Sequence, residues 1–231
     1  MRPWLLAVLL AARPAGAAYE SAPVPESPPV SAPLILDPGH GGDDLGAVAG
    51  KKREKDIALA IARKVKQKLE ALGTPIRLTR DSDVFVPLDG RVDQTLQEGL
   101  AFVSLHVNLV KSKKASGIRV YAFGKEDYHT KVPFRKKPLE PLPTPSRAEA
   151  KASGDLAAAI VHSLRVQGYR VDPPAKAGYY VLKHPNLPSV LIELGYLSNP
   201  KEAAMLGDAA YQERLADAVA ASLGSYLLAS R

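Results

Sequence analysis

The sequence predicts a single α/β domain with a central, mixed β-sheet flanked by helices. Short apolar runs of strand length alternate with longer segments in which apolar residues recur every three or four positions. This alternation is typical of folds that pack helices against a sheet. The chain has 231 residues, 46% of them hydrophobic, which is enough for one domain with a sizeable core, and no internal repeat is visible.

Residues 1–17 have the pattern of a signal peptide. Arg2 gives a positive start, residues 4–12 form an apolar run, and Ala15-Gly16-Ala17 offers small side chains for cleavage. The apolar run is too short to span a bilayer as a helix, and no later stretch is apolar for long enough to do so. A short buried or disordered N-terminus is the alternative interpretation.

Residues 18–33 are rich in proline and serine. Five prolines in this segment restrict the backbone and remove N–H donors, so we expect an extended linker rather than a packed helix or strand. The folded domain is therefore expected to cover residues 34–231.

The first predicted elements are a strand and a long helix. Residues 34–36 form an apolar strand that leads into a glycine-rich turn. Residues 57–72 carry apolar side chains at helical spacing, and Gly73 can take the left-handed conformation that ends a helix. Further strands are predicted over 76–79, 100–105, 118–123, 179–182 and 190–194, and further helices over 88–97, 149–166 and 211–228. Residues 125–147 contain five prolines and are expected to form a surface loop.

The first two candidate functional residues follow the first predicted strand. His40 lies in the turn Asp37-Pro38-Gly39-His40-Gly41-Gly42, where glycines permit positive φ values and close approach, and Asp37 is placed to orient its imidazole. The alternative interpretation is that the segment around His40 is a purely structural turn. Glu54 opens the predicted helix, and its alternatives are an acid that complements the helix dipole or a surface ion pair.

The other two candidates are associated with apolar strands. His106 directly follows the apolar run at 100–105. The alternative interpretation is that it is a hydrogen-bonded histidine of the core. Glu193 interrupts residues 189–194, which are otherwise apolar enough for a central strand. A buried carboxylate is costly unless it is paired or bound to a metal, so the alternative for Glu193 is a salt bridge to a buried arginine.

Together these side chains predict a zinc site. The chain has no cysteine, so a metal ion must be held by histidine, aspartate or glutamate. His40, Glu54 and His106 offer two imidazoles and a carboxylate, a set of three ligands that leaves a fourth position for water. Glu193 supplies the group that takes a proton from that water. We therefore predict an exported zinc hydrolase.

Six motifs in a fixed order carry a family resemblance. They are Asp37-Pro38-Gly39-His40-Gly41-Gly42 with Asp44 and Gly46-Ala47, then Glu54-Lys55-Asp56, Leu78-Thr79-Arg80, Asp83 with Leu88 and Arg91, Phe102-Val103-Ser104-Leu105-His106-Val107-Asn108, and Glu193-Leu194-Gly195-Tyr196-Leu197-Ser198-Asn199. This series closely resembles the zinc-dependent N-acetylmuramoyl-L-alanine amidases of amidase family 3, over residues 34–228.

The resemblance implies a substrate and a role for each candidate residue. His40, Glu54 and His106 correspond to the family's zinc ligands and Glu193 to its catalytic glutamate. The implied reaction cleaves the amide bond between the lactyl group of N-acetylmuramic acid and the L-alanine of the stem peptide in peptidoglycan. The implied location is the periplasm, the cell envelope or the extracellular space. We expect a monomer, with an activator protein as a candidate partner.

The chain also departs from the family pattern. It has Thr95-Leu96 where the family usually has Ala-Asn, and Gly99-Leu100 where Ala-Asp is frequent. Neither pair includes a ligand, so the departures put packing details in doubt rather than the chemistry. The segment at 125–147 lies where some family members carry a helix that plugs the site, and its proline content argues against such a plug.

Two other functions are compatible with parts of the sequence. A zinc peptidase that cleaves cross-linking peptides would use the same metal ligands. A non-catalytic wall-binding module would normally have lost a ligand or the glutamate, and none is missing. The net charge of +7 favours anionic partners, but it is modest and no nucleic-acid-binding motif organises it, so nucleic acid is not expected.

The remaining histidines and one basic run receive weaker interpretations. We expect ordinary polar roles for His129 and His162, and keep His184 as a candidate substrate contact because its connection should border the strand edge of Glu193. The basic run is expected to be a solvated surface, with contact to anionic wall polymers as the alternative. It consists of Lys111, Lys113, Lys114 and Arg119.

Overall fold

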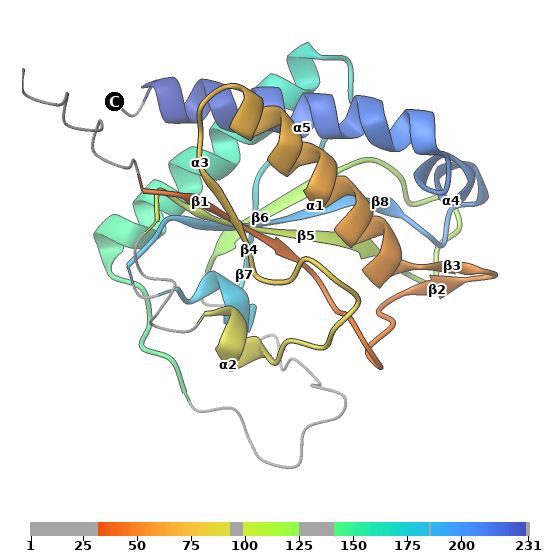
Figure 1. Ribbon diagram of the computed structural model, residues 1–231, viewed down its shortest axis with the longest axis horizontal. Coiled ribbons are helices and arrows are strands. Elements are labelled where there is room, and N and C mark those ends of the chain that lie inside the picture. The colour runs from red at the N-terminus through yellow and green to blue at the C-terminus, as the bar shows by residue number, and fades with distance from the viewer. Residues whose placement is uncertain (1–31, 93–98, 125–140, 185, 230–231) are drawn as a thin grey trace, which may run out of the picture. The chain divides into compact units, whose positions relative to one another are not determined.

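A six-stranded β-sheet runs through the domain (Figure 1). The computed structural model describes residues 32–92, 99–124, 141–184 and 186–229. The strands are, in spatial order, β4 (Ile76–Leu78), β1 (Leu34–Pro38), β5 (Phe102–Asn108), β8 (Ser189–Tyr196), β6 (Arg119–Phe123) and β7 (Ala175–Ala177). Strands β4, β1, β5 and β8 are parallel to one another, whereas β6 is antiparallel to β8 and parallel to β7. The sheet is therefore mixed, as the sequence predicts.

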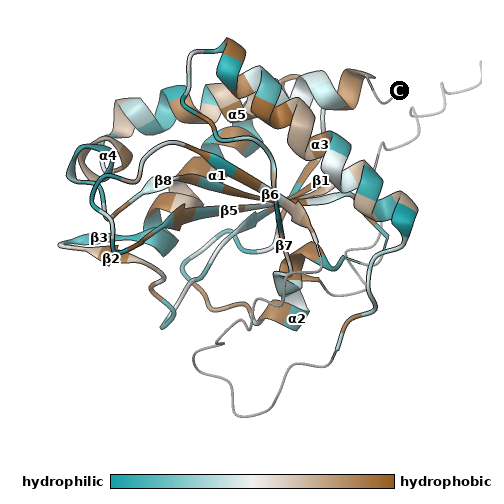
Figure 2. Cartoon of the chain, turned by 180° about the vertical axis from the view of Figure 1, so that it is seen from behind, coloured by the Kyte–Doolittle hydropathy of each residue, from teal (hydrophilic) through white to brown (hydrophobic). Residues whose placement is uncertain are grey.

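Long helices cover one face of the sheet, and two short helical turns cover the other (Figure 1). The long helices are α1 (Glu54–Ala71), α3 (Arg147–Val166) and α5 (Ala209–Ala229). The short turns are α2 (Leu88–Arg91) and the 3-10 turn η2 (Tyr180–Leu182). Figure 2 shows hydrophilic and hydrophobic residues alternating along α3 and α5, as expected for helices that bury one side. Each sheet face thus has its own hydrophobic cluster.

Helix α1 forms because its apolar side chains fall on one buried stripe. Ile57, Ile61, Val65 and Leu69 are each no more than 5% exposed and pack in the cluster between the helix and the sheet. The helix ends just before Gly73, which takes a φ of 79° that favours glycine. Its first residue lies beside the end of the neighbouring strands, so the start of α1 contributes to the edge where the strands end.

The structure differs from the predicted elements in several places. Residues 179–182 do not form a strand: Tyr180–Leu182 is the turn η2, and the edge strand lies earlier, at Ala175–Ala177. The backbone N–H groups of Leu182 and Lys183 bond to the carbonyls of Tyr179 and Tyr180, three residues earlier, and these bonds form a helical turn in place of a strand ladder. Three short elements were not predicted. These are β2 (Val48–Ala49), β3 (Lys52–Arg53) and α4 (Pro200–Leu206).

Several predictions fall outside the described residues. They concern the signal peptide at 1–17, nearly all of the linker at 18–33, the pair Thr95-Leu96 and most of the loop at 125–147. The helix predicted over 88–97 is described only as far as α2. Among the helices that the structure does describe, none combines the length and the apolar character that a membrane span requires.

A buried ion pair holds the turn after β1 in place. Asp37 is 0% exposed, and its carboxylate accepts hydrogen bonds from Thr79 Oγ1 (2.6 Å), Ser104 Oγ (2.7 Å) and Arg91 Nη1 (2.6 Å). Burial alone would raise the pKa of Asp37, but the Arg91 guanidinium and these hydrogen bonds lower it below its usual value. Arg91 also donates to the backbone carbonyl of His40 (2.6 Å). The pair therefore fixes the strand end to which His40 is attached.

Removing Asp37 should destabilise the fold strongly. We expect Asp37→Ala to lower the free energy of unfolding by about 3–5 kcal/mol, because it leaves the buried Arg91 guanidinium without its counter-charge. Asp155→Ala is the matched control, since Asp155 pairs with Lys151 on the surface (59% and 76% exposed) and such pairs contribute about 0–1 kcal/mol. Urea unfolding followed by circular dichroism measures both. Equal losses in the two variants would contradict this account of the pair.

Candidate active site

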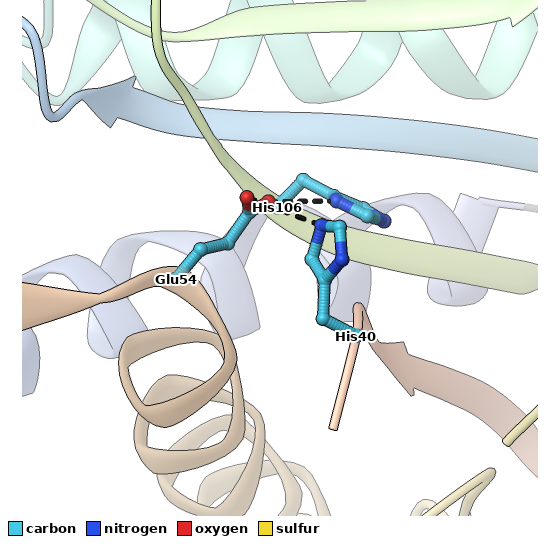
Figure 3. A group of neighbouring side chains, drawn as sticks. All are labelled: His40, Glu54 and His106. Atoms are coloured by element: carbon cyan, nitrogen blue, oxygen red, sulfur yellow. Dashed lines mark hydrogen bonds and ion pairs between the residues drawn. The ribbon is translucent and has the colours of Figure 1, made fainter. Parts of the chain in front are cut away.

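Three side chains from separate parts of the chain converge at the carboxyl ends of β1 and β5 (Figure 3). His40 follows β1, Glu54 is the first residue of α1, and His106 lies in β5. One ligand atom from each lies within 4.8 Å of the others. Glu54 stands between the two rings, with Oε2 3.1 Å from His40 Nε2 and Oε1 2.8 Å from His106 Nδ1.

Glycine is required where the backbone comes close to these side chains. A Cβ atom at Gly39 would lie 2.3 Å from the His106 ring, and one at Gly46 would lie 2.5 Å from Glu54 Oε2. His40 itself has a φ of 60°, which is uncommon for a residue with a side chain. Gly39, one of the glycines predicted to free the turn, thus also leaves space for the His106 imidazole, and Gly46 leaves space for the Glu54 carboxylate.

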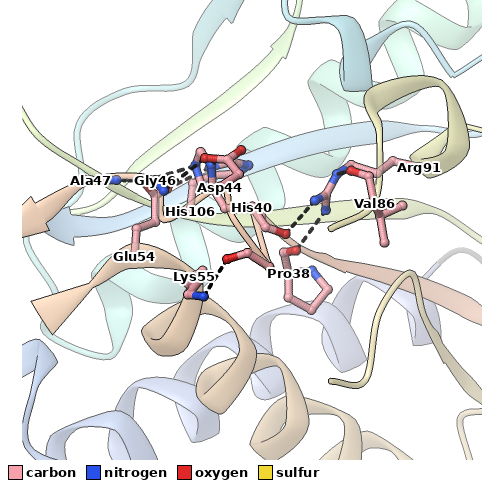
Figure 4. Close-up of polar contacts among 12 residues, drawn as sticks. Pro38, His40, Asp44, Gly46, Ala47, Glu54, Lys55, Val86, Arg91 and His106 are labelled. Atoms are coloured by element: carbon pink, nitrogen blue, oxygen red, sulfur yellow. Dashed lines mark hydrogen bonds and ion pairs between the residues drawn. The ribbon is translucent and has the colours of Figure 1, made fainter. Parts of the chain in front are cut away.

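Backbone and side-chain hydrogen bonds orient the three groups (Figure 4). The two oxygens of Glu54 accept the N–H groups of Ala47 (2.7 Å) and Val107 (2.9 Å). His40 Nδ1 lies 2.8 Å from Asp44 Oδ2, which leaves His40 Nε2 facing Glu54. Asp44 therefore orients this imidazole. The prediction that Asp37 does so is wrong, because the Asp37 carboxylate is fully engaged by the buried pair described above.

The electrostatics of the group suit a cation. Burial alone would lower the pKa of His40, but its hydrogen bonds with Asp44 and Glu54 raise that pKa to about 9. Burial would raise the pKa of Glu54, but hydrogen bonds with His106 and His40 lower it well below its usual value. The site thus stabilises positive charge next to an ionised carboxylate. Two imidazoles and a carboxylate at this spacing also fit the ligand preferences of Zn²⁺.

Glu193 lies beside this group, on the neighbouring strand. It is paired in register with His106 across β5 and β8, is only 9% exposed, and its Oε2 is buried without a hydrogen-bond partner. Burial, and then the charge of Glu54, raise the pKa of Glu193 to about 8. The alternative prediction, a salt bridge to a buried arginine, has no counterpart among the ion pairs of the described residues. The nearest arginine in register, Arg119, contacts Asp172.

All four predicted site residues line one cavity of about 430 Å³. Sequence reasoning did not identify the apolar part of its wall, which includes Phe85, Leu109 and Tyr179. Phe85 and Leu109 are 41% and 48% exposed, so their apolar surface is available to a ligand. No motif marks them, because single exposed apolar residues are common on protein surfaces.

His184 is not part of the site. It is 1% exposed and stacks against Phe102, with ring centroids 5.8 Å apart. Phe102 begins β5, whereas His106 is near the end of that strand, so the prediction that His184 borders the edge of Glu193 is wrong. His162 is exposed on α3, as expected, and His129 lies outside the described residues.

A clash at Gly46 should weaken metal binding at the candidate site. We expect Gly46→Ala to weaken Zn²⁺ binding by about 10–100-fold, the loss typical when the support of a metal ligand is disturbed. Gly50→Ala is the matched control: Gly46 and Gly50 have φ values of 65° and 61°, but a Cβ at Gly50 meets nothing within 4 Å. Titration against a zinc indicator measures both affinities. Equal weakening would show that backbone strain, rather than the clash with Glu54, is responsible.

Zinc binding should depend on pH through His40. The pKa of His40 is raised to about 9 in the metal-free protein, so at neutral pH a metal ion must displace a proton. We expect the apparent affinity to rise by about tenfold per pH unit between pH 6 and 8, and to level off only above the pKa. Competition titrations with a chelator of known pH dependence measure this slope. An affinity that is constant over this range would contradict the protonation of His40.

Comparisons with known proteins identify the family of this chain. The family model for N-acetylmuramoyl-L-alanine amidase matches residues 34–225. The chain is 33% identical to the amidase AmiA of Escherichia coli, over 84% of this chain and 75% of the relative. It is 32% identical to the amidase AmiC of Neisseria meningitidis, over 84% of this chain, and spans about half (52%) of that relative's length.

Solved structures give the same result. The amidase AmiC2 of Nostoc punctiforme superposes with a TM-score of 0.66 at 31% identity, covering 86% of this chain and 98% of that one. The CwlD amidase of Clostridioides difficile, solved in complex with the GerS lipoprotein, superposes with a TM-score of 0.69 at 29% identity, covering 86% and 99%. The fold, the convergent side chains and the family match over nearly the whole folded domain lead to one conclusion: this chain belongs to the N-acetylmuramoyl-L-alanine amidase family.

Proposed function

We propose that this chain is a zinc hydrolase that cleaves the amide bond between the lactyl group of N-acetylmuramic acid and the L-alanine of the peptidoglycan stem peptide. The observation that supports it best is the placement of Glu193 next to His40, Glu54 and His106 around one cavity. Family membership over residues 34–225 supports the choice of substrate.

His40, Glu54 and His106 would hold the zinc ion in this proposal. When bound, zinc supplies a Lewis acid that polarises the scissile carbonyl and lowers the pKa of a water molecule toward neutrality. The protein's part is to fix the ligands. Asp44 orients His40, and the N–H groups of Ala47 and Val107 hold the two oxygens of Glu54.

Glu193 carries the proton in this proposal. Its carboxylate accepts a proton from the attacking water and delivers it to the amine nitrogen of the departing alanine. A group that both takes and gives a proton works best when its pKa is near the working pH. Burial and the charge of Glu54 raise the pKa of Glu193 to about 8 in the metal-free protein, and a cation bound beside it would lower that pKa toward neutrality. Its buried Oε2 has no hydrogen-bond partner among the described residues, so no other interaction competes for the proton.

The setting of the enzyme is also part of the proposal. Residues 1–17 would direct export and residues 18–33 would link the signal peptide to the catalytic domain at 34–231, which would place the enzyme in the periplasm, cell envelope or extracellular space. The relative CwlD was solved with the GerS lipoprotein, which supports control of this chain by an activator protein. A monomeric catalytic domain remains our expectation.

Substitutions of Glu193 and His106 should have different effects on zinc content and turnover. We expect Glu193→Gln to retain zinc but to lower turnover by about 10²–10⁴-fold, the usual contribution of general acid–base catalysis. His106→Ala should lose both zinc and activity. Elemental analysis measures the metal, and digestion of purified sacculi measures turnover.

The products of the same digestion identify the bond that is cut. An amidase releases intact stem peptides with a new L-alanine amine, whereas a peptidase that cleaves cross-links leaves the alanine attached to muramic acid. Mass spectrometry of the soluble products separates the two, and a chelator should stop the release. Undiminished turnover by Glu193→Gln would remove the proposed role of this residue.

A further inference from the structure

A row of three polar side chains crosses adjacent strands at the active edge of the sheet. His106 of β5 is in register with Glu193 of β8, and Glu193 is in register with Arg119 of β6. Side chains paired in this way project from the same face of a sheet. Arg119 therefore lies one strand beyond Glu193, on the side away from the candidate metal ligands.

The guanidinium of Arg119 is partly exposed, and it contacts Asp172 and the Tyr121 ring, whose centroid lies 5.9 Å from Cζ. Its Nε lies 3.0 Å from Asp172 Oδ2 without hydrogen-bond geometry, so this buried nitrogen has no hydrogen-bond partner among the described residues. Its Nη1 donates a long hydrogen bond of 3.4 Å to the Tyr121 hydroxyl. The side chains of Arg119 and Asp172 are 40% and 43% exposed, so a ligand from solvent can reach the guanidinium and compete with Asp172.

Two of the three buried side-chain atoms that lack a partner in the described chain belong to this row. They are Glu193 Oε2 and Arg119 Nε. Such atoms are costly in a folded protein unless a ligand completes them. A donor placed beside Glu193 would complete its carboxylate, and an acceptor placed over the exposed part of the Arg119 guanidinium would compete with Asp172 for that group.

The proposed reaction brings one such donor to Glu193. The departing nitrogen of L-alanine must lie within hydrogen-bond reach of the Glu193 carboxylate to receive its proton. One residue of extended chain spans about 3.3–3.6 Å, and neighbouring strands are about 4.8 Å apart. A peptide that leaves Glu193 toward β6 therefore carries its next residue over Arg119.

We propose that Arg119 is a specificity-determining residue that binds a carboxylate on the amino acid following L-alanine in the stem peptide. A guanidinium matches a carboxylate with two parallel hydrogen bonds, and such charged hydrogen bonds are the stronger kind. This inference rests on the proposed function. It assigns to Arg119 a role that the solvated basic run of Lys111, Lys113 and Lys114, all exposed, does not share.

Two synthetic substrates test the inference. They are muramoyl-L-alanyl peptides that differ only in whether the second amino acid carries a free carboxylate or the corresponding carboxamide. We expect the native enzyme to favour the carboxylate by roughly 10–100-fold in kcat/KM, through KM. Arg119→Met should abolish this preference, so that the ratio of kcat/KM for the two substrates approaches one, and Arg119→Lys should keep part of it.

Arg170→Met is the matched control. It removes the same charge from an exposed residue whose guanidinium bonds to Ser116 rather than facing the row, so the preference should remain. Equal cleavage of the two substrates by the native enzyme would overturn the inference. An equal fall for both substrates in Arg119→Met would also overturn it, because a merely structural role predicts that result.

A binding measurement separates this inference from the proposed function. Calorimetry with the two released peptides, which start with alanine and differ in the same group, should show tighter binding of the carboxylate form by the native zinc-loaded protein and no difference for Arg119→Met. Peptide discrimination without cleavage of either muramoyl substrate would overturn the proposed function alone. Cleavage without discrimination in either experiment would overturn the role of Arg119 alone.

Discussion

The arrangement of the site depends on the contacts that the Glu54 carboxylate makes. It stands between His40 and His106, and both of its oxygens also accept backbone N–H groups, from Ala47 and Val107. These contacts join the turn after β1, the start of α1 and the end of β5 in one place. A buried carboxylate without such partners would be costly, so the same bonds that make the burial of Glu54 acceptable also set the spacing of the two imidazoles.

The turn that carries His40 is fixed by a second set of charges. Arg80 donates to the backbone carbonyls of Pro38 (2.9 Å) and Gly39 (2.8 Å), and Arg91 donates to those of Pro38 (2.9 Å) and His40 (2.6 Å). Two buried guanidinium groups thus replace the backbone partners that a turn with positive φ values cannot provide for itself. Asp37 balances the charge of Arg91 from inside the sheet. Ligand placement therefore depends in part on Asp37 and Arg80, which do not line the cavity.

Much of this arrangement could be predicted from the sequence, for identifiable reasons. Leu34–Leu36 and the run before His106 are apolar and short, and Ile57, Ile61, Val65 and Leu69 repeat at helical spacing, so local pattern sufficed for the main elements. His40 and His106 stood out because each follows a short apolar run, and Glu54 because it opens the first helix within a motif of the family resemblance. The sequence pattern gave wrong predictions where tertiary contacts decide the structure. Tyr180–Leu182 forms a buried turn instead of a strand, and Asp44 rather than Asp37 contacts His40.

Arg119 shows why the proposed anion-binding group could not be found by sequence reasoning. In the chain it follows Lys111, Lys113 and Lys114, and a basic run of this kind is usually solvated. Its relation to Glu193 exists only because β6 runs antiparallel to β8 and aligns these two positions, and neither strand's own sequence encodes that register. The sheet thus sets the imidazole, carboxylate and guanidinium in one row, in an order that suits a metal ligand, a proton carrier and an anion-binding group. In the proposed reaction the imidazole would help to hold zinc, the carboxylate would move the proton and the guanidinium would bind an anionic group of the peptide, and the register of three adjacent strands places these groups side by side.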